Sequence, residues 1–397
     1  MKYRFSDRVL SLKPSAIREI FKYASDPTVI SLSAGNPAPE AFPVHEIAEI
    51  SEKIFSSRPI EALQYNITEG YMPLRKYLKD YLKKRHGIGR GFDSILITSG
   101  AQQVMDLAAK SLINEGDTVL CEEPSFIGSL NTFRSYRAHL CGVPMQKDGM
   151  DMDALEKALK TEKNVKFIYT IPNFQNPTGI TMSLEKRRRM YELAKRYGVM
   201  ILEDNPYGDL RFAGKPVDSV KSLDEDGIVL YAGTFSKVIA PGLRVGYAVG
   251  PSELLQKMIV CKQGEDVHTN IWAQMVCYEM MAHTDFDAHL SRLRTVYRNK
   301  AGTASDALDR YLKPLVTYLP IEGGLFFWCT LPKGTDMPGF CRKAAERKVC
   351  VVPGNAFLTD ETLPCSSFRI NYTTPGNEEL VKGIQILGSL ARDVISR

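Results

Sequence analysis

The chain lacks the features that mark several large classes of protein. No apolar run approaches the ~18 consecutive residues that a membrane-spanning helix requires. The six histidines form no His-Glu-x-x-His motif and no cluster with cysteine, so no metal site is predicted. A formal charge of only +5 over 397 residues favours neither nucleic acid nor an anionic membrane surface as a partner.

The chain also lacks patterned cysteines and a leader segment. Its eight cysteines are scattered, without a Cys-x-x-Cys pair, and most lie in apolar surroundings such as Val119-Leu-Cys121. Such cysteines are typical of buried thiols in a reducing compartment. The first residues, Met1-Lys-Tyr-Arg-Phe-Ser-Asp7, contain no apolar core of a signal peptide. We therefore expect a cytoplasmic protein.

An alternation of short apolar strands and amphipathic helices occupies the middle of the chain. The strands are continuous apolar runs, which is typical of a parallel sheet buried on both faces. Helices are expected between them at 101–113, 151–160 and 184–197, before them at 44–56 and 71–85, and after them at 251–263 and 268–282. The expected strands are Ile95–Thr98, Thr118–Cys121, Leu140–Val143, Lys166–Ile171, Val199–Leu202, Ile228–Ala232 and Val245–Val249.

Both ends of the chain depart from this rhythm. Strands are expected at 30–32, 316–319, 324–330, 349–352 and 368–372, and helices at 15–23, 286–311, 337–346 and 376–395. The sequence thus predicts an α/β fold. A large domain with a seven-stranded, mainly parallel sheet flanked by helices is joined by a smaller α+β domain formed by both chain ends. The expected divisions are 1–45 (N-terminal arm and part of the small domain), 46–285 (large domain) and 286–397 (small domain).

The residues that follow the strands carry the functional signal, because ligands collect beyond the carboxyl ends of parallel strands. Gly100 separates a strand from a helix whose first N–H groups can bind a phosphate. Lys237 lies beside Gly233, Thr234 and Ser236 after the sixth strand, well placed as an amine that condenses with a carbonyl, the way in which pyridoxal phosphate is held. A surface loop with one lysine is the alternative.

Three further strand ends allow two interpretations each. Phe126 suits stacking on a planar ring or simple core packing. Asn176 precedes a proline and suits either a ligand contact or an ordinary turn. Asp204, at the exit of a buried strand, needs a cationic partner such as a pyridinium N–H, or serves as a helix cap. By contrast, Lys186-Arg-Arg-Arg189 is interpreted as a solvated helix face.

Seven motifs then follow one another in a recognisable order. They are Gln64-Tyr65…Gly70…Leu74-Arg75, Ser99-Gly-Ala-Gln102, Pro124-Ser-Phe126, Asn176-Pro-Thr-Gly179, Asp204-Asn-Pro-Tyr207, Ser236-Lys237…Pro241-Gly-Leu-Arg244-Val-Gly246 and Phe368-Arg369. From about residue 15 onward the sequence resembles the fold-type I, class I/II aminotransferases that use pyridoxal phosphate. It is most similar to their 2-aminoadipate and kynurenine group, through Ser15-Ala-Ile-Arg18-Glu, Phe174-Gln-Asn176, Lys262-Gln-Gly-Glu-Asp-Val-His268-Thr and Gly323-Gly-Leu-Phe326.

The resemblance implies pyridoxal 5′-phosphate as cofactor and a role for each matching residue. Lys237 would carry the cofactor as a Schiff base and shuttle the substrate proton, and Asp204 would pair with the ring N–H. The other implied roles are Asn176 and Tyr207 at the ring hydroxyl oxygen; Phe126 stacked on the ring; Ala101, Gln102, Thr234, Ser236, Arg244 and, across a dimer interface, Tyr65 at the phosphate; and Arg369, with Asn176 and the Gly35 backbone, at the substrate α-carboxylate. Lys237, Asp204 and Tyr207 form the implied catalytic set.

Substrate choice stays open at this stage. The similar group usually has Gly-Gly-Leu-Pro where this chain has Gly35-Asn36-Pro37, which leaves the substrate preference uncertain. A serine is commoner in place of Ala101 and of Thr234, although a backbone N–H and a threonine hydroxyl still suit a phosphate. Arg18 would meet an acidic substrate side chain, or would simply lie on a solvated helix face.

The expected activity is transfer of an amino group from an L-amino acid to a 2-oxo acid, 2-oxoglutarate above all, by a homodimer with shared active sites and ping-pong kinetics. A β-lyase or decarboxylase that uses the same cofactor is the alternative within enzymes. The effector domain of a transcription regulator is a third reading, which is disfavoured because the resemblance begins near residue 15 and leaves no room for a preceding DNA-binding domain.

Overall fold

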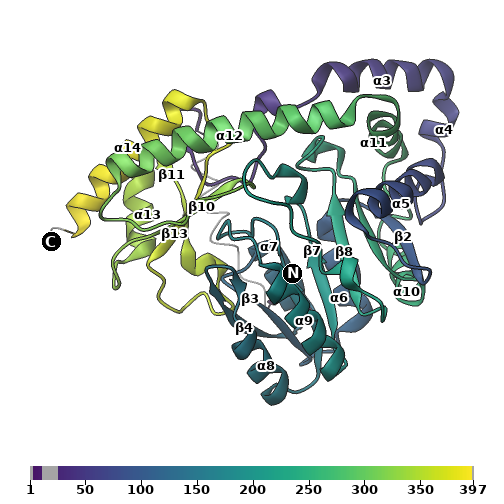
Figure 1. Ribbon diagram of the computed structural model, residues 1–397, viewed down its shortest axis with the longest axis horizontal. Helices are drawn as coiled ribbons and strands as arrows, with labels where there is room; N and C mark the ends of the chain where they lie inside the picture. Colours follow the sequence, from purple (N-terminus) through teal and green to yellow (C-terminus); the bar gives the residue numbers. More distant parts are fainter. Residues whose placement is uncertain (1–2, 11–25, 396–397) are drawn as a thin grey trace.

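The computed structural model describes residues 3–10 and 26–395 of the chain (Figure 1). A short helix, α1 (Asp7–Leu10), lies in the first of these ranges. The helix expected at 15–23, which carries Arg18, falls outside the described residues. Within them, no helix is both long and apolar enough to cross a membrane.

The main sheet contains eight strands in the order β2-β9-β8-β7-β6-β3-β4-β5. Neighbours from β8 through β4 run parallel, whereas β9 runs antiparallel to both β8 and β2. All seven predicted strands are present, and the eighth is the two-residue β5, paired antiparallel with β4. The strands are β2 (Asp93–Thr98), β3 (Thr118–Glu123), β4 (His139–Gln146), β5 (Gly149–Met150), β6 (Val165–Thr170), β7 (Met200–Asp204), β8 (Val229–Thr234) and β9 (Gly246–Pro251).

This arrangement brings the functional strand ends together. Because β2 and β8 both oppose β9, they point in the same direction as β3, β6 and β7. The loops after these five strands therefore leave one edge of the sheet. The fold class predicted from the sequence is confirmed, with a predominantly parallel sheet between helices (Figure 1).

Helices pack against this sheet and against one another at its β2 side. The sequence pattern finds all of them except two short helices, α4 and α7. Weak helix propensity explains the second omission, since α7 contains Gly128, Asn131 and Thr132 within nine residues. The helices are α3 (Val44–Ser57), α4 (Pro59–Leu63), α5 (Met72–His86), α6 (Ala101–Leu112), α7 (Ile127–Ser135), α8 (Met152–Thr161), α9 (Leu184–Tyr197), α10 (Ser252–Gln263) and α11 (Ile271–His283).

A second unit is built from the end of the chain and a piece of its beginning. A three-stranded antiparallel sheet has the order β10-β13-β12, and β1 pairs in parallel with β11. Leu32, just after β1, belongs to a hydrophobic cluster made otherwise of residues from 301 to 391. The elements are β1 (Ile30–Ser31), β10 (Phe326–Thr330), β11 (Val349–Cys350), β12 (Val352–Pro353), β13 (Ser367–Asn371), α12 (Phe286–Tyr311), α13 (Met337–Glu346) and α14 (Asn377–Ile395).

The strand expected at 316–319 is wrong. Only an isolated bridge forms there, between Thr317 and Thr330, and prolines at 314 and 320 flank the segment. Proline supplies no N–H for a ladder, so pairing does not extend beyond one residue. Figure 1 shows the long helix α12 passing from the region of α11 to α14, so that it joins the two units. The exact domain boundaries stay a prediction.

Candidate active site

A cavity of about 490 Å³ opens at the edge where β2, β7 and β8 end. All candidate residues that the structure describes line it except Tyr65. Loops after separate strands contribute most of them, and Gly35 and Arg369 come from the second unit. The lining candidates are Gly35, Ala101, Gln102, Phe126, Asn176, Asp204, Tyr207, Thr234, Ser236, Lys237, Arg244 and Arg369. The fold therefore gathers side chains that are more than 300 positions apart in the sequence.

Lys237 lies in the turn that follows β8, and its amine contacts the backbone of Gly35, which also lines the cavity. Its Nζ donates a hydrogen bond of 2.8 Å to the carbonyl oxygen of Gly35. Burial, together with the neighbouring guanidinium groups of Arg244 and Arg369, lowers the pKa of Lys237 to about 8. A substantial fraction of this amine is thus neutral near pH 8, as a nucleophile requires.

The N-terminus of α6 forms a cradle for an anion. Gly100 has φ of 79°, and the N–H groups of Ala101 and Gln102 precede the first hydrogen bond inside the helix. Arg244 donates 3.2 Å to the Ser99 carbonyl, and a side chain at Gly100 would overlap its guanidinium group. Thr234 completes this wall, its hydroxyl lying 3.0 Å from that of Ser236. Free N–H groups, hydroxyls and a guanidinium at a helix N-terminus suit a phosphate.

Asp204 ends β7 and is 4% exposed. Its Oδ2 accepts a hydrogen bond of 2.9 Å from the Tyr169 hydroxyl, whereas its Oδ1 is buried without a partner among the described residues. Burial raises the pKa of Asp204 to about 7, opposed by the Tyr169 hydrogen bond and assisted by the nearby carboxylates of Glu122 and Glu203. The unpaired Oδ1 needs a donor, and a cationic N–H would both satisfy it and keep it ionised.

Asn176 connects the middle of the cavity with its far wall. Its Nδ2 donates to the Tyr207 hydroxyl at 3.4 Å, and its Oδ1 accepts from Arg369 at 2.8 Å. The Tyr207 ring packs edge-on against Phe326. Asn176 and Tyr207 are therefore neighbours, and Asn176 also lies in a turn that Gly179 closes by donating to the Gln175 carbonyl at 2.6 Å, so the ligand role of Asn176 stays a prediction.

Arg369 is a buried cation in β13. Its guanidinium lies 4.2 Å from the ring centre of Phe326 and 5.0 Å from that of Phe357, and it donates to the Ser33 carbonyl at 2.5 Å. Its Nε is buried and has no partner within residues 3–10 and 26–395. Burial lowers its pKa to about 10, so it stays charged near neutral pH. A planar fork held between two rings suits a carboxylate.

One candidate among the described residues does not line this cavity. Tyr65 is 80% exposed, and its ring meets that of His268 edge-on at 5.8 Å. Arg18 falls outside the described residues, so its expected contact with an acidic side chain stays a prediction.

Sequence reasoning missed three buried residues that hold the site together. Tyr169 reads as a core residue of β6, although a buried tyrosine hydroxyl signals a polar partner. Glu122 is fully buried at the end of β3, where it accepts from the Thr170 hydroxyl at 2.6 Å and from Gln175 at 3.1 Å. Gln175 in turn donates to the Pro124 carbonyl at 2.7 Å. This network ties the loop before Asn176 to the one before Phe126.

The interpretation of residues 186–189 as a solvated helix face is wrong for Arg187. This side chain is 0% exposed, and it donates to the carbonyls of Met182, Pro172 and Asp218 at 2.8–3.0 Å. The signal was in the helical spacing, since residues 187, 190 and 194 of α9 share one buried face. The buried Arg187 guanidinium stays charged because backbone oxygens accept its hydrogen bonds.

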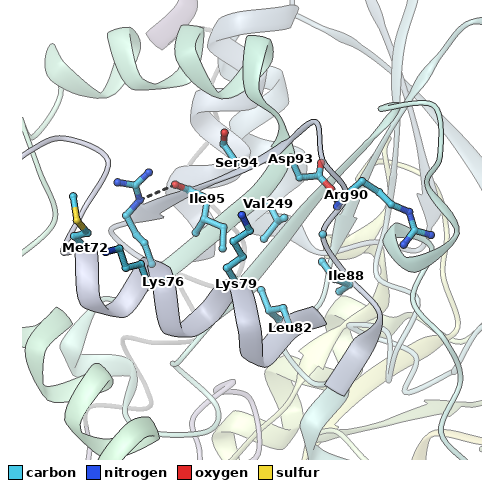
Figure 2. Close-up of a pocket in the computed structure, with 12 residues that line it drawn as sticks. Met72, Lys76, Lys79, Leu82, Ile88, Arg90, Asp93, Ser94, Ile95 and Val249 are labelled. Carbon is cyan, nitrogen blue, oxygen red and sulfur yellow. Dashed lines mark hydrogen bonds between the residues drawn. The ribbon is translucent and has the colours of Figure 1, made fainter. Parts of the chain in front are cut away.

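Figure 2 shows a different cavity, of about 300 Å³, between α5 and the start of β2. It contains Lys76, Lys79 and Arg90 but none of the candidate residues. Its one acid, Asp93, already accepts from the Lys221 amine at 2.7 Å. Within residues 3–10 and 26–395, no group of three or more His, Cys, Asp or Glu side chains is placed to hold a metal. The candidate catalytic residues therefore lie in the cavity of about 490 Å³ and not in this one.

Comparison with known proteins gives a consistent result. The sequence profile of the family described as "Aminotransferase class I and II" matches residues 27–384. Aromatic-amino-acid aminotransferase 1 of Thermococcus litoralis is 37% identical over 397 residues, which cover 99% of this chain and 95% of that protein. The 2-aminoadipate transaminase of Thermus thermophilus is 38% identical over 97% of this chain and 96% of its own length.

One solved structure is similar to this chain in both fold and sequence. The crystal structure of an alpha-aminoadipate aminotransferase from Thermus thermophilus, complexed with N-(5′-phosphopyridoxyl)-L-leucine, superposes with a TM-score of 0.91 and 37% identity. The match covers 99% of this chain and 98% of that one. The similarity therefore extends over both units of the fold.

Proposed function

This chain belongs to the class I and II aminotransferases, and from that premise we propose that it passes the amino group of an L-amino acid to 2-oxoglutarate in two successive half-reactions. Amino transfer and dependence on pyridoxal phosphate are properties of the family and of the similar structures. The acceptor and the residue roles below are our proposals. The observation that carries them is that Lys237, the unpaired Oδ1 of Asp204 and Arg369 line one cavity.

The residues around this cavity fit the cofactor group by group. The α6 cradle, with Gly100, Thr234, Ser236 and Arg244, suits the phosphate. The unpaired Oδ1 of Asp204 suits a protonated ring nitrogen. Phe126, at the cavity wall, suits stacking on the ring, and Asn176 and Tyr207 suit its hydroxyl oxygen. When bound, the cofactor supplies an electron sink for the pair of electrons left when a proton leaves the substrate.

Lys237 would act first as a nucleophile and then as a proton carrier. Its Nζ would hold the cofactor, and once a substrate amine has taken its place the free Nζ would accept the proton from the substrate Cα. A pKa near 8 suits both steps, since neither the neutral nor the charged form is rare at that pH. Tyr207, with a pKa raised by burial, would stay protonated and hold the ring oxygen by its hydroxyl.

Arg369 would fix the substrate by its α-carboxylate. Two parallel N–H···O bonds from the guanidinium would orient the Cα–H bond toward Lys237. Asn176 and the backbone of Gly35 would support this orientation, because Asn176 already contacts Arg369 and Gly35 already contacts Lys237.

A second copy of the chain would complete the phosphate site. Tyr65 is highly exposed and lies outside the cavity of its own protomer, which supports its proposed role across a dimer interface. Large apolar side chains surround it on α4, the following loop and the start of α5. The exposed ones are Ile60, Leu63, Ile67 and Met72. Such a cluster suits a contact between protomers.

The donor amino acid is the least determined part of the proposal. Relatives named for aromatic amino acids and for 2-aminoadipate make these two classes the first donors to test. Arg18 stays our candidate for an acidic side chain. We also retain the cytoplasm as the proposed location, on the evidence of the scattered cysteines.

The test is a paired assay of amino transfer. The holoenzyme, an aromatic amino acid or 2-aminoadipate, and 2-oxoglutarate should yield glutamate. Lys237→Ala should abolish this product, whereas Lys215→Ala, an exposed loop position, should leave it unchanged. Full turnover by Lys237→Ala would overturn the proposed role of the lysine.

The same assay separates the alternatives. Release of ammonia or carbon dioxide without glutamate would favour a β-lyase or a decarboxylase. Formation of alanine from pyruvate, with no glutamate from 2-oxoglutarate, would correct the acceptor and leave amino transfer standing.

A further inference from the structure

The two oxygens of Asp204 lie in different surroundings. Asp204 and Tyr169 project from neighbouring parallel strands, with Tyr169 paired opposite Leu202, two residues before the aspartate. Side chains two positions apart in a strand share a face of the sheet. The Tyr169 hydroxyl therefore reaches Oδ2 at 2.9 Å, while Oδ1 has no partner in the part of the chain that the structure describes.

Tyr169 is itself held by a second hydroxyl. Its phenol oxygen accepts a hydrogen bond of 2.9 Å from Ser129, and its ring meets Phe133 edge-on at 5.3 Å. All three side chains are 0% exposed. A tyrosine hydroxyl has one proton to donate. Because Ser129 approaches as a donor, that proton is directed to Asp204.

Burial and the adjacent Asp204 raise the pKa of Tyr169 well above its usual value. The hydroxyl therefore keeps its proton at any working pH and stays a donor. Without it, Asp204 would lose the one hydrogen bond that favours its charged form against the desolvation that raises its pKa.

We propose that Tyr169 is a positioning residue for the cofactor ring, and that Ser129 orients it. The Tyr169 hydroxyl holds Asp204 ionised and turned so that Oδ1 is presented to the ring nitrogen. Ser129 lies in α7, which begins directly after Phe126, so the same helix sets both the stacking wall and the aspartate. This inference rests on the proposed role of Asp204 in binding the ring.

A packing role alone would not need the hydroxyl. Phenylalanine fills the same space as tyrosine apart from one oxygen, and the ring contact with Phe133 would persist. Replacement by phenylalanine leaves Oδ2 and the Ser129 hydroxyl unpaired, which acts on the carboxylate and not on the shape of the core. The effect should therefore depend on whether a bound ring carries a nitrogen.

The experiment measures the affinity of two ligands for the apoenzyme. One is pyridoxamine 5′-phosphate, which cannot bond to Lys237, and the other is its 1-deaza analogue, with carbon in place of the ring nitrogen. Tyr169→Phe should raise the Kd of the first about tenfold and that of the second by less than about twofold. Ser129→Ala should raise the ratio of the first Kd to the second in the same direction, by about threefold.

Tyr81→Phe is the matched control, because it removes a buried hydroxyl that has no partner in the described residues and lies on α5. The ratio of the two Kd values in Tyr81→Phe should equal that in the wild type. In the loaded enzyme, Tyr169→Phe should lower kcat and leave the KM for the amino acid within about twofold, since Arg369 is untouched. The Kd ratio is taken within one variant, so a loss of folded protein cancels.

Equal weakening of both ligands by Tyr169→Phe would overturn the inference and leave the hydroxyl with a packing role. Asp204→Asn in the same assay separates this result from a failure of the proposed function. If that variant loses the preference for the ring nitrogen while Tyr169→Phe keeps it, only the role of Tyr169 is wrong. If neither variant loses it, the role of Asp204 is wrong as well.

Discussion

At the scale of single residues, the site consists of charged side chains taken out of water. Burial lowers the pKa values of Lys237 and Arg369 to about 8 and about 10 and raises that of Asp204 to about 7. Each shift favours the neutral form, as desolvation requires. The lysine and the aspartate thereby become groups that exchange protons near neutral pH, whereas the arginine stays a fixed cation.

The pKa of Lys237 predicts how fast the apoenzyme takes up its cofactor. The neutral amine is the reactive form, so the initial rate of covalent uptake should rise with pH and level off above about 8. Borohydride trapping after short incubation with pyridoxal phosphate, followed by mass spectrometry of the Lys237 peptide, measures this rate.

Arg369→Met provides the control for that measurement. It removes one of the cations that lower the pKa, so the midpoint should move to higher pH. A wild-type midpoint near that of a free lysine, ~10.4, would contradict the assigned effect of burial.

At the scale of elements, the junction of β2 and α6 depends on a glycine. Gly100→Ala places a methyl group against the Arg244 guanidinium and also strains a backbone with φ of 79°. The strain should lower stability by about 1–2 kcal/mol, and displacement of Arg244 should weaken pyridoxal phosphate binding roughly tenfold or more.

Gly116→Ala carries the strain without the displacement. Gly116 has φ of 86°, but a methyl group there meets no atom of the described residues within 4 Å. Thermal unfolding should show similar losses for the two variants, and a cofactor titration should show weak binding for Gly100→Ala alone. Equal affinities would mean that Arg244 does not depend on the space that Gly100 leaves.

Helix α9 illustrates a charge that supports the fold around the site. Arg187→Lys removes the planar fork, so the Asp218 carbonyl loses its Arg187 donor and the Pro172 carbonyl keeps only the hydrogen bond from the Met182 N–H. We expect a loss of roughly 2–4 kcal/mol in the free energy of unfolding. Arg188→Lys, on the exposed side of the same helix, should change it by less than about 0.5 kcal/mol. Urea denaturation measures both, and equal effects would refute the role given to the buried guanidinium.

At the scale of the whole molecule, the cavity of one chain is incomplete if Tyr65 acts across a dimer interface. Tyr65→Ala should weaken cofactor binding, and Lys237→Ala should abolish turnover. In a mixed dimer of the two variants, the site that keeps Lys237 receives the intact Tyr65 of the other chain. Activity should therefore reappear when the variants are unfolded and refolded together at limiting cofactor.

Tagged purification of the mixed dimers makes that result decisive. A verified mixed dimer without recovered activity would place the action of Tyr65 within its own chain or remove it from the site. Refolding each variant alone is the matched control, and it should give no recovery.

Most helices and strands, and most residues that line the candidate cavity, could be predicted from the amino-acid sequence. Burial on both faces leaves a continuous apolar run along each strand, and burial on one face leaves a helical period, so all seven long strands of the main sheet were readable locally. The motif order supplied the family, and it named the lysine, the aspartate and the arginine of one cavity. Short α7, with weak helix formers, fell below that local signal, whereas the apolar run at 316–319 predicted a strand where only one bridge forms, at Thr317.

The side chains that hold these residues in place could be identified only from the three-dimensional packing. Tyr169 and Asp204 are 35 positions apart, and Asn176 and Arg369 are 193 apart, yet each pair shares a hydrogen bond. Burial of Arg187 and Glu122 likewise depends on partners supplied by other segments. Periodicity records whether a position meets water or the core. It does not record which polar group lies opposite, because that follows from the packing of strands and loops distant in the chain.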